Sequence, residues 1–154
     1  MPIPAHVARL RAQVGSELLQ FPSVSVLVRD AQHRLLLVKH VHNGLWGLVG
    51  GVVELDEDPA EAARRETLEE TGLSVSIGRL LGAFGGRDYR VTYENGDETS
   101  YVCIAYDATV VGGEMRPDGD ETTEVAWFDS DSLASADLNT LAKALLRAVG
   151  LLAV

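Results

Sequence analysis

The feature that most constrains this chain is a glutamate-rich segment whose two ends both carry helix-boundary residues. Asp58 can cap a helix N-terminus with its side chain, and Pro59 suits the first helical position. Glu61 falls three residues after the cap, where a glutamate can complete a capping box. Gly72 supplies the residue type at which helices commonly end. The sequence therefore predicts one helix between these boundaries.

Three glutamates of this predicted helix share one face. At about 100° per residue, Glu66, Glu69 and Glu70 fall within one arc of roughly 100°. Like charges at these spacings destabilise an isolated helix by a few tenths of a kcal/mol per pair. Positive charge near this face would offset the repulsion. Hard divalent cations with oxygen ligands would supply it. The alternative is a solvated helix with Glu61–Arg65 and Arg65–Glu69 pairs, and the helix alone leaves both interpretations open.

The rest of the chain is typical of strands in series, with an amphipathic helix at each end. The N-terminal helix is expected from Val7 to Leu18, and the C-terminal helix from Leu138 to Leu151. Strands are expected at 23–28, 34–38, 45–49, 74–77, 80–84, 89–93, 100–111 and 125–128. Few long helices among many strands favour an α+β layered domain over a regularly alternating parallel sheet.

Composition limits the domain count and the partners. The 154 residues suit one domain, which we expect at 21–154 with the helix of residues 1–20 packed on it. A net charge of −10 disfavours long nucleic acid as a partner, although metal ions could neutralise a small phosphorylated ligand. No stretch is apolar enough to span a membrane, and Met1–Gln20 lacks the apolar core of a signal peptide. The single cysteine, Cys103, forms no intramolecular disulfide, so a reducing cytoplasm is expected.

The loop before the predicted helix completes a known pattern. Together with the helix it matches G-x(5)-E-x(7)-R-E-U-x-E-E-x-G-U at Gly51, Glu57, Arg65, Glu66, Glu69, Glu70 and Gly72. In this box the chain resembles the Nudix (MutT-like) hydrolases. A looser similarity includes residues 45–48 and 121–128. The chain departs from the family pattern at Val49, where proline is common, at Asp56, where glycine is common, and at Thr67, where an aliphatic residue is common.

The resemblance implies a Nudix-like α/β/α sandwich around a mixed β-sheet, with Mg²⁺ or Mn²⁺ held by the loop–helix–loop. It implies that Glu66, Glu69 and Glu70 act as metal ligands or as the base, and that the Gly50 carbonyl completes the shell. The implied reaction cleaves a phosphoanhydride bond in a nucleoside diphosphate linked to another moiety, such as ADP-ribose or a nucleotide sugar, or in a nucleoside triphosphate. The alternative is a non-catalytic nucleotide-binding sensor with the same fold.

Three charged residues have supporting roles in this hypothesis. Arg65 is expected to orient a carboxylate through a forked pair, with ordinary helix pairing as the alternative. Glu57 either reaches a metal through water or favours the helix N-terminus. Glu121 is the candidate acid from outside the box, preferred over Asp120 and Glu124, although a solvated acidic loop explains it equally well.

The residues that would hold the rest of the substrate are less defined. Phe84, Tyr89 and Tyr93, with Trp46, are the aromatic side chains available for stacking, and sheet packing is the alternative. His40 and His42 are interpreted as packing or surface residues and are left outside the site. Resemblance also suggests a homodimer, with the helix from Val7 to Leu18 as a contact.

Overall fold

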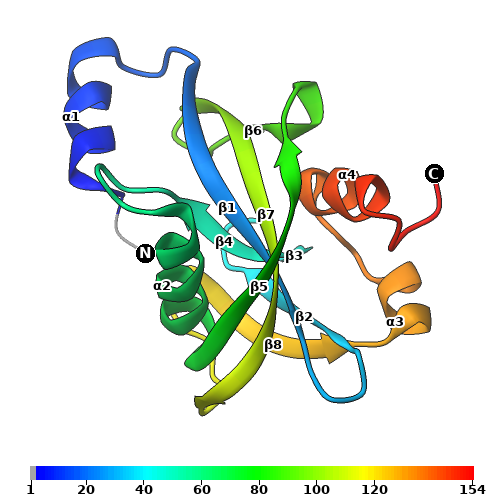
Figure 1. Cartoon of the computed structure of the whole chain (residues 1–154). Helices are drawn as coiled ribbons and strands as arrows, with labels where there is room; N and C mark the ends of the chain where they lie inside the picture. Colours follow the sequence, from blue (N-terminus) through cyan, green and yellow to red (C-terminus); the bar gives the residue numbers. More distant parts are fainter. Residues whose placement is uncertain (1–2) are drawn as a thin grey trace.

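The computed structural model describes residues 3–154, which form one eight-stranded sheet with helices on both faces (Figure 1). The strands are β1 (Leu19–Arg29), β2 (Leu35–His40), β3 (Trp46–Gly47), β4 (Val49–Val52), β5 (Leu73–Phe84), β6 (Arg90–Thr92), β7 (Glu98–Gly113) and β8 (Thr122–Phe128). The helices are α1 (Ala5–Val14), α2 (Pro59–Thr71), α3 (Ser130–Ser135) and α4 (Thr140–Ala148), with a 3-10 turn, η1 (Arg87–Tyr89).

The sheet is mixed, as expected. Its main path runs β3-β2-β1-β7-β5, while β4 pairs with β1, β6 with β7 and β8 with β2. The long strands β1 and β7 are parallel, whereas the other pairs are antiparallel. The strands expected at 23–28 and 34–38 form within β1 and β2, but these two strands pair with each other only at Arg29 and Leu35. The earlier part of β1 pairs with β4 instead, which brings the two glycines of β4 against Ser25 and Val24.

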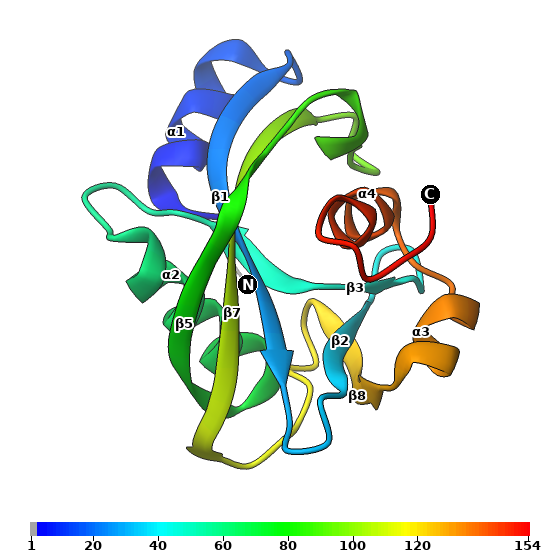
Figure 2. The same cartoon turned by 45° about the vertical axis from the view of Figure 1, so that its right-hand side comes forward.

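Successive side chains of the central strands point to opposite faces of the sheet, where they pack into two separate hydrophobic cores. Leu36 and Val38 of β2 pack on the face covered by α2, whereas Leu35 and Leu37 pack on the face covered by α3 and α4. Figure 2 shows α1 and α2 on one side of the sheet and α3 and α4 on the other. This arrangement confirms the predicted α/β/α sandwich.

The N-terminal helix is shorter than predicted. Helix α1 ends at Val14 because Gly15, at a φ of 64°, turns the chain out of the helix. Leu18 therefore lies outside the helix and is exposed. Arg11 fixes α1 to β7, where its guanidinium donates to the Glu98 carbonyl at 2.7 Å and to Thr99 Oγ1 at 3.1 Å.

The C-terminal region contains two helices where the sequence predicts one. Asp129 caps α3 by accepting from Ser132 N at 2.8 Å, and Asn139 caps α4 by accepting from Ala142 N at 2.8 Å. The second cap starts α4 two residues after Leu138. None of the helices in the described part of the chain is long and apolar enough to cross a bilayer.

Candidate active site

Helix α2 has the boundaries that the sequence predicts. Asp58 Oδ1 accepts from Ala60 N at 2.8 Å, and Gly72 ends the helix in the left-handed conformation with a φ of 73°. The sequence predicts that Glu61 completes a capping box, but its carboxylate forms an ion pair with Arg64. The helix lies beside β4 and β5, so its glutamates face the strand that carries Gly50 and Gly51.

Glu66 and Glu70 are buried, which excludes the solvated-helix interpretation for both. Glu66 is fully inaccessible, and its Oε2 atom has no hydrogen-bond partner among the described residues. Glu70 is 2% exposed, and its Oε2 accepts from Gly50 N at 3.3 Å. Burial raises the pKa of Glu66 to about 8 and the pKa of Glu70 well above its ordinary value. Glu69, by contrast, keeps 41% of its side chain exposed.

The two glycines of β4 allow the strand to approach both the sheet and the helix. A Cβ at Gly51 would overlap the Glu66 carboxylate, and a Cβ at Gly50 would overlap the Val24 carbonyl of β1. Only glycine therefore fits at these positions without displacing a neighbour. At Gly51, the group that a side chain would displace is the buried Glu66 carboxylate itself.

Arg65 forms a forked pair with a carboxylate, and the partner is Glu57 of the loop before α2. Its Nε and Nη2 atoms form a fork with Glu57 at 2.7 and 2.9 Å, which lowers the pKa of Glu57. Its Nη1 donates to Glu66 Oε1 at 2.9 Å, and Glu69 is more distant at 3.4 Å. Arg65 thus joins the loop before α2 to one oxygen of Glu66, while the other Glu66 oxygen has no hydrogen-bond partner among the described residues.

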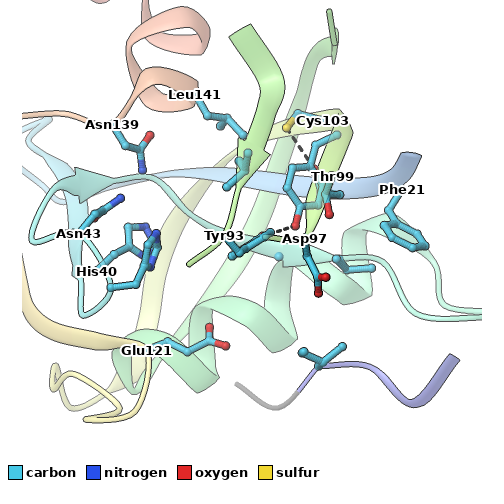
Figure 3. Close-up of a pocket in the computed structure, with 18 of the residues that line it drawn as sticks. Phe21, His40, Asn43, Tyr93, Asp97, Thr99, Cys103, Glu121, Asn139 and Leu141 are labelled. Carbon is cyan, nitrogen blue, oxygen red and sulfur yellow. Dashed lines mark hydrogen bonds between the residues drawn. The ribbon is translucent and has the colours of Figure 1, made fainter. Parts of the chain in front are cut away.

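Glu121 comes to the same site from a loop outside the box. It lines the cavity together with Glu70, and its charge adds to the effect of burial in raising the pKa of Glu66 and Glu70 (Figure 3). Asp118 organises this loop: its Oδ1 accepts from the backbone N–H groups of Asp120, Glu121 and Thr122 at 2.9, 3.0 and 2.9 Å. Sequence reasoning missed Asp118, although an aspartate before a glycine is a common turn signal.

A cavity of about 670 Å³ opens from these carboxylates between β1, β4, β6, β7 and the start of α4. Tyr93 lines it, and so do His40 and His42, which the sequence interpretation leaves outside the site. Phe84 and Tyr89 lie elsewhere, in a shallow depression beside α4. Trp46 packs edge-on against Phe128, with ring centroids 4.9 Å apart. Of the predicted aromatic contacts, only Tyr93 is brought to the cavity.

The donor set fits a hard divalent cation. An ionised Glu66 oxygen buried without a partner is costly, and a cation that accepts oxygen ligands removes that cost. Within residues 3–154 no group of three or more His, Cys, Asp or Glu side chains is placed so that it could hold a metal ion by itself. A cation here would therefore combine the Glu66 and Glu70 carboxylates with other oxygen atoms, as expected for a metal that shares its ligands with a phosphate.

Solved structures of known proteins share this fold. The structure superposes on the MutT protein from Methanosarcina mazei Go1 with a TM-score of 0.71 and 24% identity, over 86% of this chain and 94% of that one. A solved UDP-X diphosphatase gives a TM-score of 0.67 and 21% identity, over 94% of this chain and 69% of that one. These similarities define the fold, a Nudix sandwich.

Sequence comparisons identify the family. Residues 19–149 match the NUDIX domain. A MutT-like protein of Streptomyces ambofaciens is 33% identical over 127 residues, which cover 82% of this chain and 75% of that protein. The NAD-capped RNA hydrolase NudC of Vibrio vulnificus (strain CMCP6) is 33% identical over 129 residues, but this chain spans only 45% of its length. The chain belongs to the Nudix hydrolase family.

Proposed function

We propose that this protein is a metal-dependent diphosphatase that cleaves the phosphoanhydride bond of a nucleoside diphosphate linked to another moiety, or of a nucleoside triphosphate. The observation that carries the proposal is the inaccessible Glu66 carboxylate, whose unpartnered oxygen lies next to Glu70 beneath Gly51. A phosphate cannot approach this negative group unaided. With Mg²⁺ or Mn²⁺ bound, the site gains positive charge that offsets the phosphate and lowers the pKa of coordinated water.

The roles of the chain's own residues follow from their positions. Glu66 and Glu70 are proposed as metal ligands because burial fixes both side chains. Glu69 is proposed as a further ligand or the base, since its partial exposure leaves it free to meet water or substrate. Gly50 would contribute its carbonyl, as the resemblance implies. Glu121 would act from the facing loop as an additional acid–base or ligand group.

Arg65 and Glu57 have a supporting role in this proposal. Their forked ion pair holds the loop before α2, while the second Arg65 amino group holds Glu66 Oε1. Glu57 is therefore proposed to act through Arg65, with contact to a metal through water as the other possibility. Preorganised charge of this kind is worth about 3 kcal/mol at a transition state.

Names of relatives support the substrate class without defining the substrate. One relative is an ADP-ribose pyrophosphatase of Methanocaldococcus jannaschii, 33% identical over 116 residues that cover 73% of this chain and 64% of that protein. The solved UDP-X diphosphatase acts, by its name, on a similar bond. Both names describe nucleoside diphosphates with a second group attached. We infer the same class here, acting in the cytoplasm on small substrates without long nucleic acid or a membrane as partner.

A substrate panel tests the proposal. ADP-ribose, NADH, UDP-glucose, ATP and dGTP would each be incubated with Mg²⁺, with Mn²⁺ and with excess chelator, and the products would be separated directly by anion-exchange chromatography. Metal-dependent turnover of at least one compound is expected. Tight binding of a compound without turnover under any metal would instead support the nucleotide-binding sensor.

A further inference from the structure

Helix α1 lies outside the part of the chain that matches the family domain. The NUDIX domain covers residues 19–149, whereas α1 spans Ala5–Val14. Even so, Val7 and Arg11 of this helix line the same cavity as Glu70. The proposed chemistry gives these two residues no role. The helix therefore adds a wall to the cavity that the matched domain does not include.

This wall stands where an edge of the sheet meets the cavity. In Figures 1 and 2 α1 lies beside β1. On that edge β4 pairs with Ser23–Val26, and no strand in the described part of the chain pairs with Leu19–Phe21. The His6 and Phe21 rings meet there in a T-shaped contact, with centroids 6.2 Å apart. Phe21 also lines the cavity, on the side away from His40 (Figure 3). A helix at this place is either a fixed cover of the strand edge or a movable lid.

The apolar attachment of α1 is small. Among Ala5–Val14 only Val7 is buried, whereas six residues of α2 are buried. Leu10 keeps 40% of its surface exposed. Segments that bury few apolar side chains open locally at a lower free-energy cost than the core. Apolar packing by itself therefore holds α1 weakly.

The connection from α1 to β1 contains a hinge. Gly15 ends the helix at a φ of 64° and a ψ of −134°, a conformation that residues with a Cβ rarely adopt. Apart from its chain neighbours, no heavy atom lies within 4 Å of the place where a Cβ on Gly15 would stand. One residue later, Ser16 Oγ donates to Asp97 Oδ1 at 3.0 Å. The chain after Gly15 is thus tied to the turn between β6 and β7, so rotation at Gly15 would move α1 alone.

Arg11 joins the helix to the chain beyond this hinge. Its guanidinium donates to the Gly15 and Glu17 carbonyls at 3.1 and 2.6 Å, in addition to its bonds to β7. Its side chain is only 12% exposed, and Asp97 lies 3.6 Å away. A rotation of α1 at Gly15 would break the bonds to β7. One side chain therefore determines whether the helix stays against the sheet.

We propose that α1 is a lid on the substrate cavity, hinged at Gly15 and held closed by the Arg11 guanidinium. When closed, the lid completes the cavity wall beside Phe21 and restricts the access of water to the carboxylates. When open, it gives substrate and products a path at that end of the cavity. This inference rests on the proposed function for what the cavity contains, but not for the motion of the helix.

Amide hydrogen exchange of the whole chain, followed by mass spectrometry, tests the motion without any substrate. A lid predicts faster exchange in α1 than in β7, because local opening does not require global unfolding. Arg11→Ala should raise the exchange rate of α1 at least about tenfold and leave β7 unchanged, because hydrogen bonds from a charged donor are worth a factor of that size. Arg9→Ala, which changes an exposed arginine of the same helix, is the matched control. Equal exchange of α1 in the two variants would overturn the lid.

Cys103 reports whether this opening reaches the cavity. It is the single cysteine of the chain, it lines the cavity, and it is 1% exposed. Its thiolate would attack the neutral disulfide 4,4′-dithiodipyridine, forming a mixed disulfide and releasing 4-thiopyridone, which is followed by absorbance. The reaction is run at alkaline pH because burial raises the pKa of this thiol.

The labelling rate of Cys103 should rise in Arg11→Ala by about the same factor as α1 exchange, because both rates follow the population of the open form. Arg9→Ala should label at the wild-type rate. Faster exchange in α1 with unchanged labelling of Cys103 would mean that the helix moves without opening the cavity, which would overturn the lid. Neither measurement needs turnover, so failure of every compound in the substrate panel would reject the proposed function alone.

Discussion

Glu66→Gln should stabilise the metal-free protein at alkaline pH while it abolishes most activity. Glutamine has nearly the size of glutamate but no charge, so it resembles the protonated side chain in a site where Glu66 is inaccessible and one oxygen lacks a partner. The buried charge is therefore removed without a cavity being created. Arg65 Nη1 can still donate to the remaining side-chain oxygen.

The expected size follows from the pKa of Glu66, which burial raises to about 8 from an ordinary 4.5. Each pKa unit corresponds to about 1.4 kcal/mol, so the full penalty for the charged form is about 5 kcal/mol. Because the folded state binds the proton more tightly than the unfolded state, the free energy of unfolding falls as pH rises from 4.5 to 8 and then levels off. Below pH 4.5 this penalty is absent. About 4 kcal/mol of this penalty develops as the pH rises from about 5 to about 8.

Urea denaturation in excess chelator at about pH 5 and about pH 8 measures this effect. Between these two pH values, the free energy of unfolding of the wild type should fall by several kcal/mol more than that of Glu66→Gln. Added Mg²⁺ should stabilise the wild type more than the variant. Turnover should fall about a hundredfold or more. Glu61→Gln is the matched control, because it removes an exposed charge from the same helix. Equal pH dependence in wild type and Glu66→Gln would refute the burial argument.

Three further predictions can be checked together. Gly51→Ala should lower turnover at least about tenfold, because a Cβ would displace the Glu66 carboxylate, and normal kinetics would contradict this. Asp118→Ala should lower kcat through a misplaced Glu121, while Asp118→Asn, which keeps the accepting oxygen, should restore most of it in the same assay. Light scattering at micromolar concentration should give the mass of a homodimer in contact through α1, and a monomer mass would reject that association.

Local signals explain why α2 is predictable from sequence. Asp58, Pro59 and Gly72 define its ends through short-range capping, and the spacing of the box points to Glu66, Glu69 and Glu70 as a group. Burial is not predictable from the helix alone, since the same face is compatible with solvent. It depends on β4, whose glycines come close only because β1 pairs with β4 at residues 23–26 and with β2 only at Arg29.

Long-range geometry explains the residues that sequence reasoning misses or misplaces. Pairing of β5 with β7 shifts register between Ile77 and Leu80 and again before Gly82, so simple alternation does not show which face Phe84 occupies. His40 reaches the cavity because of a bulge opposite β8, a strand more than eighty residues later in the chain. Neither feature leaves a readable pattern near the residue itself.

Product analysis of a cleaved nucleoside diphosphate compound most directly tests the central claim that buried carboxylates recruit a metal to break a phosphoanhydride bond. The compound would be the best substrate of the panel, incubated with Mg²⁺ or with excess chelator, and the products would be separated by anion-exchange chromatography. A nucleoside monophosphate and the phosphorylated second moiety should appear with Mg²⁺ and be absent with chelator. Full turnover in chelator, or free base beside an intact diphosphate, would contradict the account.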